Sequence, residues 1–377
     1  MTILSPLKAR IKATDTLINE IVYRLYGLTG EEIKIIADSK DRETACFSTT
    51  FIGGFMLSNE VIERENFTIS QVSEFLSALS RDNERWENPY PQKLKTQKTG
   101  WISRCHADSR WELIPLALRT GTILEFMTPV KHAPLSNNQE QIGAEYRLIE
   151  NFRQFLDERG LPIPEDSQEF HSNKIKTIKK LILPILKGKK TWPPEKYLSL
   201  MALAQHHRIP TRLLDWTRDP YVAAYLAAKE AAEWIVGVKK PPKEGVETLS
   251  VWALNTFFLD VYQNKIKRQV ITVTAPAYGN PNLHAQKGLF TLERLQSFSP
   301  DGAVYQRPLD EFVTDVFMKH KIGNGLLPIM RELTIPISAS HEILRRLSAR
   351  FVNAATLYPG FDGAAEALKE QRLWDKT

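Results

Sequence analysis

The sequence predicts an α+β fold, in which a mixed β-sheet is surrounded by helices. Short, largely apolar runs such as Leu249–Leu254 are strand-like, while longer stretches place apolar residues at helical spacing. Strands and helices follow one another without a regular strand–helix–strand repeat, which argues against a doubly wound parallel sheet. No glycine-rich phosphate loop follows any strand, so Rossmann and P-loop folds are excluded as well.

The chain is expected to divide into an N-terminal accessory region (residues 1–90) and a main domain (residues 91–377). The boundary lies in Glu87–Gly100, where prolines, asparagine and lysines interrupt the apolar pattern. Within the accessory region we expect a helix over Asp15–Tyr26 and a short strand near Phe47–Phe55.

A second N-terminal helix is predicted to begin at Thr68. Thr68 and Gln71 have the spacing of a capping box, in which the two side chains satisfy each other's backbone N–H groups. The apolar residues that follow lie on one helical face: Val72, Phe75, Leu76 and Leu79.

The main domain is expected to mix strands and helices irregularly. Strands are predicted at Gly100–Arg104, Leu249–Leu254, Val270–Ala275 and Leu333–Ile337, and helices at Ala144–Arg159, Pro194–His206, Tyr221–Trp234 and Ala339–Arg350.

Composition excludes several classes of protein. With 42% hydrophobic and 25% charged residues, the chain falls among globular rather than disordered proteins. No apolar run reaches the roughly 18 residues of a membrane span, and the first ten residues lack the apolar core of a secretory signal. We therefore expect a cytoplasmic protein without membrane contact. Two cysteines, Cys46 and Cys105, are too few for a disulfide framework or a cysteine-rich zinc site.

The net charge of +6 favours contact with RNA or DNA, although a mild excess is often only a matter of solubility. The densest basic cluster comprises Lys174, Lys176, Lys179, Lys180, Lys187, Lys189 and Lys190. Such a cluster forms either a solvated helix face or a surface that follows phosphates. On the second interpretation the nucleic-acid-binding residues are Lys179, Lys180, Lys189 and Lys190.

The most specific segment is Met201–Ala228, MALAQHHRIPTRLLDWTRDPYVAAYLAA. A helix is predicted to end at His206, and Pro210 prevents its continuation. Asp219 and Pro220 begin a second helix, with aspartate at the N-cap and proline in the first turn.

Between these helices we expect an extended stretch, Thr211–Leu214, followed by a turn that carries Asp215, Trp216 and Thr217. Polar side chains on such a turn are candidates for a site. The alternative is structural: Asp215 pairs with Arg212 or caps the helix, and Trp216 belongs to the core.

This segment resembles the FRG-domain family, a module recurrent in bacterial and phage-conflict proteins, in the order of its glutamine–histidine, threonine–arginine and leucine–leucine–aspartate–tryptophan–threonine groups. Trp101–Pro115 resembles the segment that names the family, with Ser103-Arg104-Cys105 in place of phenylalanine–arginine–glycine. Asn282–Thr291 resembles the family's alanine–glutamine–x–glycine–x–phenylalanine strand, and Thr356–Ala365 its C-terminus. The resemblance covers roughly residues 100–370.

The arrangement of these motifs is similar to that of ADP-ribosyltransferases, so the resemblance implies a split mixed sheet and NAD as substrate. The implied residues are Asp215 and Gln286 for catalysis and Arg104, His206, Trp216 and Thr217 for NAD binding. We expect all six to converge on one cleft. Because a glutamine cannot act as a base, Asp215 or Glu293 would supply the negative charge.

Structural alternatives remain for two of these residues. Arg104 is either a phosphate- or carboxylate-binding fork or one partner of a structural salt bridge. The Gln286 amide either faces a ligand or is satisfied by neighbouring backbone. Since His206 and His207 are adjacent and have no cysteine beside them, no metal site is predicted.

We therefore expect an NAD-dependent ADP-ribosyltransferase that modifies a protein or nucleic acid, serves as a toxin or anti-phage effector, and is controlled by an antitoxin or other regulatory protein. One alternative is a non-catalytic module that binds nucleic acid or a nucleotide. Another is a metal-independent nuclease built on His206, His207 and Asp215.

Overall fold

The computed structural model describes most of the chain after residue 60. The described residues are 61–86, 100–119, 121–126, 135–167, 178–261, 269–274, 281–295, 298–320 and 328–374, together with two short strands before residue 60. Those strands, β1 (Phe51–Ile52) and β2 (Phe55–Met56), pair antiparallel where the sequence predicts a short strand. The helix predicted at Asp15–Tyr26 and the linker predicted before Gly100 lie outside the described residues.

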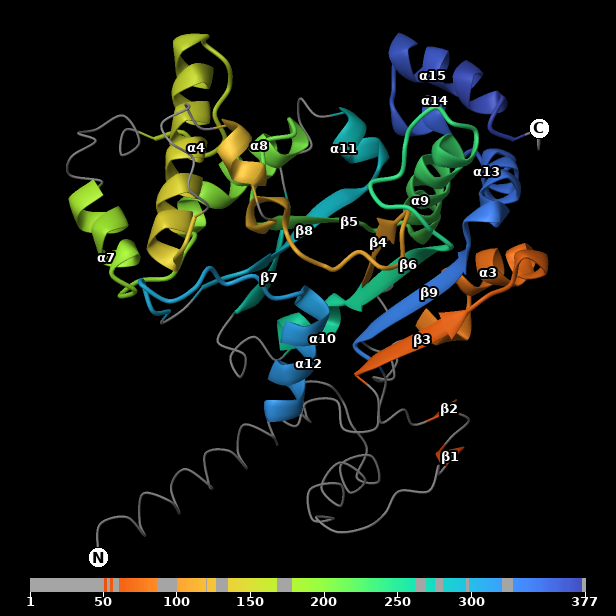
Figure 1. Cartoon of the computed structure of the whole chain (residues 1–377), viewed down its shortest axis with the longest axis horizontal. Helices are drawn as coiled ribbons and strands as arrows, with labels where there is room; N and C mark the ends of the chain where they lie inside the picture. Colours follow the sequence, from red (N-terminus) through yellow and green to blue (C-terminus); the bar gives the residue numbers. More distant parts are fainter. Residues whose placement is uncertain are drawn as a thin grey trace, which may run out of the picture.

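A mixed seven-stranded sheet forms the centre of the fold (Figure 1). In spatial order its strands are β3 (Ile62–Asn66), β9 (Met330–Pro336), β6 (Thr248–Asn255), β4 (Trp101–His106), β5 (Leu213–Thr217), β8 (Gly288–Glu293) and β7 (Val270–Val273). Among these strands β3 and β9 run parallel, and the other neighbours run antiparallel. Helices flank the sheet, so the fold is α+β, as the sequence predicts.

The sheet consists of two well-paired halves that meet at a narrow contact between β4 and β5. β4 pairs with β6 along its whole length, and β5 does the same with β8. Between β4 and β5 the register contains only the pair Ser103 and Thr217. The two strands diverge after this pair, which leaves a split near the centre of the sheet.

Helix α9 (Pro220–Ile235) packs against the β4–β6 half of the sheet. The Asp219 side chain caps it by accepting from the Tyr221 N–H at 3.1 Å, as predicted. Small, fully buried residues line its length: Ala223, Ala224, Ala227, Ala228, Ala231 and Ala232. Because these side chains are short, the helix backbone can approach the strands closely.

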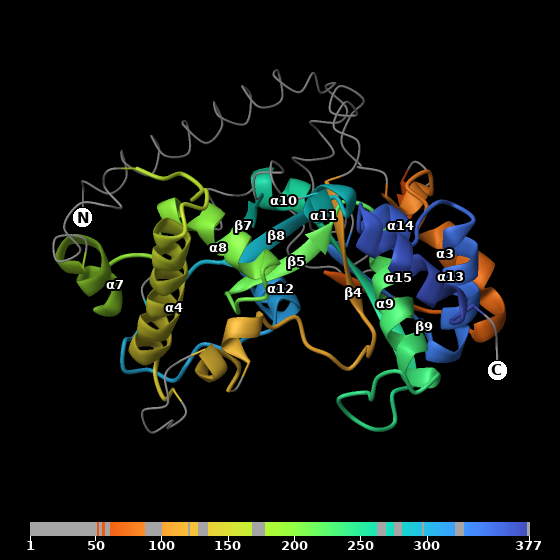
Figure 2. The ribbon, with the colours of Figure 1, turned by 90° about the horizontal axis from the view of Figure 1, so that it is seen from above.

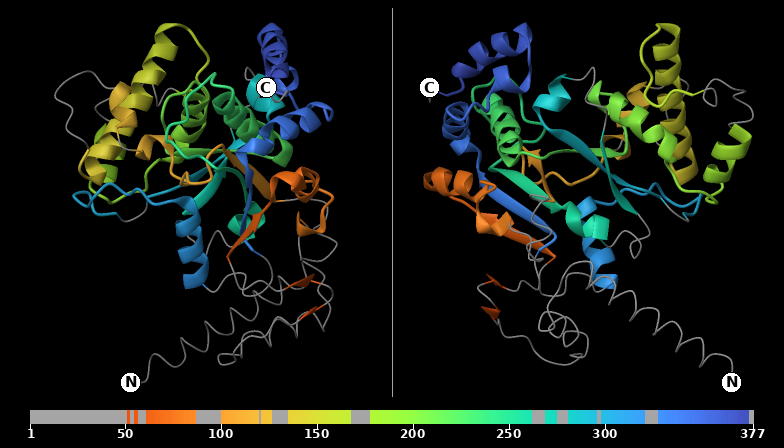
Figure 3. Two further views of the ribbon diagram at one scale, coloured as in Figure 1. Left: turned by 45° about the vertical axis from the view of Figure 1, so that its right-hand side comes forward. Right: turned by 180° about the vertical axis from the view of Figure 1, so that it is seen from behind.

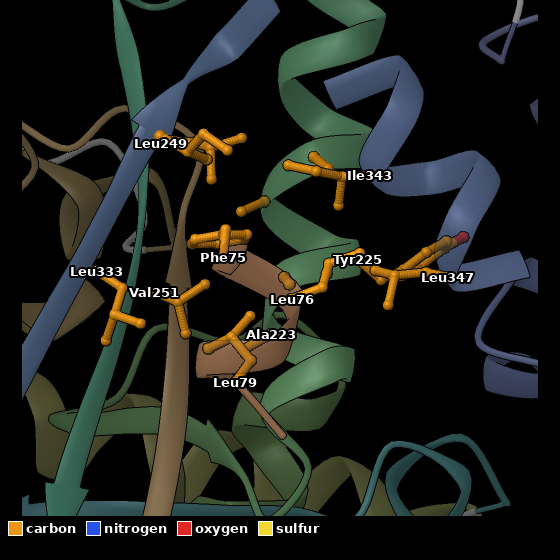
Figure 4. Close-up of a cluster of buried hydrophobic side chains, with 14 of the residues drawn as sticks. Phe75, Leu76, Leu79, Ala223, Tyr225, Leu249, Val251, Leu333, Ile343 and Leu347 are labelled. Carbon is orange, nitrogen blue, oxygen red and sulfur yellow. The ribbon is translucent and has the colours of Figure 1, made fainter. Parts of the chain in front are cut away.

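The largest hydrophobic core lies between this half of the sheet, α9, α3 (Val72–Ala78) and α13 (Ser340–Ser348). Figure 4 shows side chains from all three helices meeting those of β6 and β9: Phe75, Leu76, Leu79, Ala223, Tyr225, Leu249, Val251, Leu333, Ile343 and Leu347. The predicted capping box precedes α3, where the Gln71 side chain accepts from the Thr68 N–H at 2.9 Å.

Strand β3 and helix α3 lie N-terminal to the boundary expected near residue 90, yet both belong to the main sheet and its core. The division into residues 1–90 and 91–377 therefore does not coincide with a break in the core.

Helices α4 (Asn138–Glu158) and α8 (Leu198–His206) cover the β5–β8–β7 half, on the same side of the sheet as α9 (Figures 1 and 2). Helices α10 (Thr256–Val261) and α12 (Leu309–Lys319) lie on the opposite side (Figure 3). None of the described helices has the length and apolar character to cross a bilayer.

The remaining helical segments are short or peripheral. They are α7 (Leu183–Leu186), α11 (Pro281–Ala285), α14 (Ala354–Leu357) and α15 (Phe361–Gln371), with single 3-10 or π turns at Ile69–Gln71, Glu84–Trp86, Leu116–Leu118, Thr122–Phe126, Ile178–Ile182, Glu195–Tyr197 and Ile337–Ala339.

Two predicted features near the candidate residues are wrong in detail. Asp215, Trp216 and Thr217 lie in strand β5 rather than on a turn, because pairing with β8 continues as far as Thr217. Arg104 lies inside its strand rather than at the end, since pairing with β6 extends β4 to His106. In both cases a partner strand distant in sequence extends the element.

Candidate functional site

A pocket of about 360 Å³ lies at the split between β4 and β5. This volume is within the range of small-molecule sites, which is about 300–1,000 Å³. All six residues expected to converge are among those that line it: Arg104, His206, Asp215, Trp216, Thr217 and Gln286. Helix α9 forms one wall through Val222, Ala223, Leu226 and Glu230.

Arg104 bridges the split. Its Nη1 donates to the backbone carbonyl of Asp215 at 2.7 Å, and the same atom lies 3.8 Å from the Asp215 carboxylate. The guanidinium thus links two strands that share almost no ladder hydrogen bonds here. Its Nε is buried and has no hydrogen-bond partner among the described residues. Arg104 therefore combines a structural contact with an unused donor.

Neither structural alternative accounts for Asp215. Arg212 pairs instead with the buried Glu145, through its Nε and Nη2 at 2.7 Å each. The helix cap is Asp219, and the Asp215 side chain is 59% exposed. Its carboxylate can therefore meet a ligand.

The orientation of Asp215 is set by Gln205 at the end of α8. The Gln205 Nε2 donates to the Asp215 carboxylate at 2.9 Å, and its Oε1 accepts from the Thr211 hydroxyl at 2.7 Å. The second bond assigns the amide orientation, because a hydroxyl that donates must face the carbonyl oxygen. These two hydrogen bonds hold the Asp215 carboxylate at the pocket, and only one of its two oxygens contacts Gln205.

Thr217 and Gln286 join β5 to the turn before β8. The Thr217 hydroxyl donates to the Gln286 carbonyl at 2.7 Å and accepts from the Asp219 N–H at 3.0 Å. The Gln286 Nε2 donates to the Leu357 carbonyl at 3.3 Å. This contact agrees with the interpretation in which neighbouring backbone satisfies the glutamine amide, although Gln286 also lines the pocket. Gly288 leaves room for the Leu283 side chain, which a Cβ at this position would overlap.

Trp216 forms a wall of the pocket rather than an open stacking surface. Its side chain is buried in the core shared with Leu214 and Trp252, and its indole N–H donates to the Thr291 hydroxyl at 2.8 Å. This placement agrees with the core interpretation of Trp216. Its contribution to a ligand is confined to the part of the ring that borders the pocket.

His206 is half-buried in the pocket, whereas His207 is exposed and is not among the lining residues. Burial lowers the pKa of His206, the adjacent His207 lowers it further, and Asp215 opposes both effects. The imidazole is therefore neutral at physiological pH and can accept a hydrogen bond. The ring centroids of His206 and His207 lie 5.3 Å apart, and of the two only His206 lines the pocket together with Asp215.

Glu293, considered as a source of negative charge, lies elsewhere. Phe290 is the β8 residue that pairs with Asp215, and Glu293 lies three positions after it. The Glu293 side chain therefore points to the opposite face of the strand from that of Phe290. It borders a separate cavity of about 10 Å³ with Arg212, Tyr305 and Arg307. Glu293 therefore cannot supply charge to the pocket at the split.

Four further polar or aromatic residues line the pocket and were not singled out from the sequence: His106, Trp111, Arg119 and Glu230. Periodicity could have found two of them. His106 shares a strand face with Arg104, and Glu230 continues the helical face of Val222 and Leu226. Burial raises the pKa of Glu230, Lys239 opposes this shift, and Glu233 adds to it.

The Cys105 thiol also lines the pocket, at the position of the triplet glycine. Burial raises its pKa to about 11, against the lowering effect of Arg104. The thiol is therefore protonated at neutral pH and is a poor nucleophile. Within the described residues no group of three metal-binding side chains occurs.

The lysine cluster is separate from this pocket. Lys179, Lys180, Lys187, Lys189 and Lys190 are exposed around α7, whereas Lys174 and Lys176 lie outside the described residues. Figures 1 and 2 place α7 beyond α4, at the end of the molecule away from α9. Ile182 and Ile185 anchor the segment in a small core.

One known protein family matches β4, β5 and α9, which supply most of the residues that line this pocket. The family model of the FRG domain matches residues 99–234, from the start of β4 to the end of α9. This part of the chain is an FRG domain. The match includes Arg104, His206, Asp215, Trp216 and Thr217, and it ends before Gln286. No curated protein and no solved structure matches the chain.

Proposed function

We propose that this FRG-domain protein is a cytoplasmic, NAD-dependent ADP-ribosyltransferase that modifies a macromolecule, either protein or nucleic acid. The observation that carries the proposal is the meeting of Arg104 and Asp215, 111 residues apart in sequence, on the two sides of one split. A split sheet with an arginine on its first strand is also what the similarity to ADP-ribosyltransferases implies.

The residues of the pocket fit NAD. An arginine with an unused donor suits a phosphate, and the neutral His206 and the Gln286 Oε1 can accept hydrogen bonds from ribose hydroxyls. The apolar wall that Val222 and Leu226 of α9 contribute suits an uncharged base.

Asp215 has the charge that the reaction requires. A nucleophilic atom of the macromolecule forms a bond to the ribose C1′ and loses its proton, while the nicotinamide–ribose bond breaks and its electron pair leaves with nicotinamide. Positive charge develops on the ribose during this step. A preoriented carboxylate stabilises that charge. Gln205 holds Asp215 in place before the reaction, so little reorganisation is needed. The negative charge comes from Asp215, and Gln286 assists by hydrogen bonding.

Two further parts of the proposal concern the cell. We propose that the chain acts as a toxin or anti-phage effector, because modifying an essential macromolecule stops growth of the host or phage. Such an activity requires restraint, which an antitoxin or other regulatory protein would provide. The exposed lysines around α7 support RNA or DNA as the target, and they equally support a second candidate, a nucleic-acid-binding module without turnover.

Titration with NAD and measurement of nicotinamide release test the enzymatic proposal. We expect the wild-type chain to bind NAD and release nicotinamide, and Asp215→Asn to slow release by about 10²–10³-fold, the typical effect of removing one preorganised electrostatic group. NAD affinity should change much less, because the carboxylate acts mainly in the transition state.

Asp362→Asn is the matched control, since Asp362 is an exposed aspartate on α15 and does not line the pocket. Release by Asp215→Asn at the wild-type rate, or a wild-type chain that neither binds NAD nor releases nicotinamide, would overturn the proposal.

A further inference from the structure

A second arginine lines the same pocket as Arg104. Arg119 follows the 3-10 turn Leu116–Leu118, and its Nε donates to the Ile114 carbonyl at 3.1 Å. The side chain is accessible, and no carboxylate ion pair to it occurs among the described residues.

The two guanidinium groups are close enough to affect each other. Desolvation lowers the pKa of Arg119 first and the positive charge of Arg104 lowers it further, while Asp215 opposes both effects. Neither carboxyl group of the pocket compensates this pair fully. Asp215 lies 3.8 Å from Arg104 and already accepts from Gln205, while burial favours the neutral form of Glu230. Two like charges held together in a pocket favour an anion between them.

His106 supplies an independent observation. It is 1% exposed, lines the pocket, and neither ring nitrogen has a hydrogen-bond partner among the described residues. Burial, followed by the charges of Arg104 and Arg119, keeps the pKa of His106 well below the ordinary value, against smaller opposing effects from Asp108 and the Trp111 backbone, so the ring is neutral and carries one N–H. Buried polar groups almost always have partners, so an unpaired histidine at a pocket marks the place of a ligand atom or water.

We infer that Arg104, Arg119 and His106 form a subsite for a diphosphate group, as found in a dinucleotide or a nucleoside diphosphate. Two guanidinium groups from separate segments can each contact one phosphate, and the histidine N–H can donate to a phosphate oxygen. A carboxylate carries a single negative charge and would leave one arginine uncompensated, and a monophosphate offers one phosphorus centre to two guanidinium groups from separate segments. The inference rests on the proposed function in one respect, since the diphosphate would be that of NAD.

Calorimetric titration of the full chain with inorganic pyrophosphate, ADP-ribose, inorganic phosphate and adenosine tests the subsite. We expect pyrophosphate and ADP-ribose to bind more tightly than phosphate or adenosine. Arg119→Gln should weaken both diphosphate ligands at least about tenfold, which is the effect of losing one charge-assisted hydrogen bond. Arg119→Lys, which keeps the charge but not the fork, should weaken them less.

Arg110→Gln is the matched control for charge. Arg110 is half-exposed, pairs with Asp108 and does not line the pocket. If Arg110→Gln and Arg119→Gln lose equal amounts of diphosphate affinity, the loss arises from net charge alone, and the subsite is overturned. Unchanged pyrophosphate binding in Arg119→Gln, or no preference of the wild type for diphosphate, would overturn it as well.

The subsite and the transferase proposal can fail separately. Suppose that Arg119→Gln loses diphosphate binding and that the wild-type chain releases no nicotinamide from NAD. The subsite is then supported and the transferase proposal is rejected. Nicotinamide release that is insensitive to Arg119 would retain the transferase and reject the subsite. Thermal melting of each variant verifies that it is folded.

Discussion

Asp215 illustrates how the chemistry of a residue depends on the partners its neighbours have already taken. Two plausible partners, Arg212 and the N-terminus of α9, are occupied by Glu145 and Asp219. The carboxylate is consequently left at the pocket, held by Gln205 and facing Arg104. Local sequence alone also allows Asp215 to be the helix cap. That interpretation is wrong, because Asp219, four residues later, is the residue that caps α9.

Glu293 yields a prediction at the same scale. Burial raises its pKa from 4.5 to about 7, although Tyr305, Arg212 and Arg307 oppose the shift. The folded state therefore holds this proton more tightly than the unfolded state does. The contribution to stability is complete below pH 4.5 and is lost as the pH rises to about 7. In Glu293→Gln this loss should be absent.

Urea denaturation between pH 5 and pH 8 measures the difference. The free energy of unfolding of the wild type should fall relative to that of Glu293→Gln by on the order of 1 kcal/mol across this range. Parallel pH profiles for the two proteins would show that Glu293 titrates normally.

At the scale of elements, the pocket exists because two strands diverge. β4 and β5 share one registered pair, and each is fully paired on its other side. The alanine-rich α9 then lies close over β4 and closes one wall of the opening. The strands β4 and β5 thus set the position of the pocket, and α9 forms one of its walls. The FRG family model matches all three elements.

The segment around α7 carries the prediction for this scale. Replacing Lys189 and Lys190 by glutamine, or Lys179 and Lys180, should weaken RNA or DNA binding and flatten its salt dependence. Each lost phosphate contact reduces the slope of log affinity against log salt by about 0.7–0.9. Affinities measured at several salt concentrations give this slope, and NAD binding should be unchanged because the cluster lies away from the pocket.

The double variant of Lys240 and Lys243 to glutamine serves as control, since both lysines are exposed in the loop after α9. Slopes equal to that of the wild type in all variants would identify the cluster as a solvated face.

At the scale of the whole molecule, the N-terminal strand and helix are part of one core. β3 is an edge strand of the main sheet, and Phe75 is fully buried between α9 and the strands (Figure 4). Phe75→Ala should therefore destabilise the entire main domain by about 3–5 kcal/mol, the usual cost of removing a buried aromatic ring.

Thermal unfolding followed by tryptophan fluorescence and by circular dichroism checks this expectation. Both signals should shift together to lower temperature in Phe75→Ala, while Ser77→Ala, at an exposed position on the same helix, should leave them unchanged. A main transition that stays at the wild-type temperature would mean that residues 62–79 fold independently.

Local patterns were sufficient for the α+β class and for the helices at α3, α8, α9 and α13, whereas the six pocket residues came from the family resemblance. Caps, prolines and apolar periodicity act within a few residues, so they can be read from a single segment. The family resemblance then indicated which polar positions belong together, although it did not distinguish an accessible Asp215 from a buried Trp216.

The tertiary structure decided the features that depend on distant partners. Strand pairing placed Asp215–Thr217 in β5, extended β4 to His106 and turned Glu293 to the opposite face. The same packing placed Arg119 and Arg104 in the lining of one pocket and left His106 there without a hydrogen-bond partner among the described residues. These outcomes arise from contacts between segments that are far apart in sequence, and neither composition nor periodicity encodes which strand lies beside which.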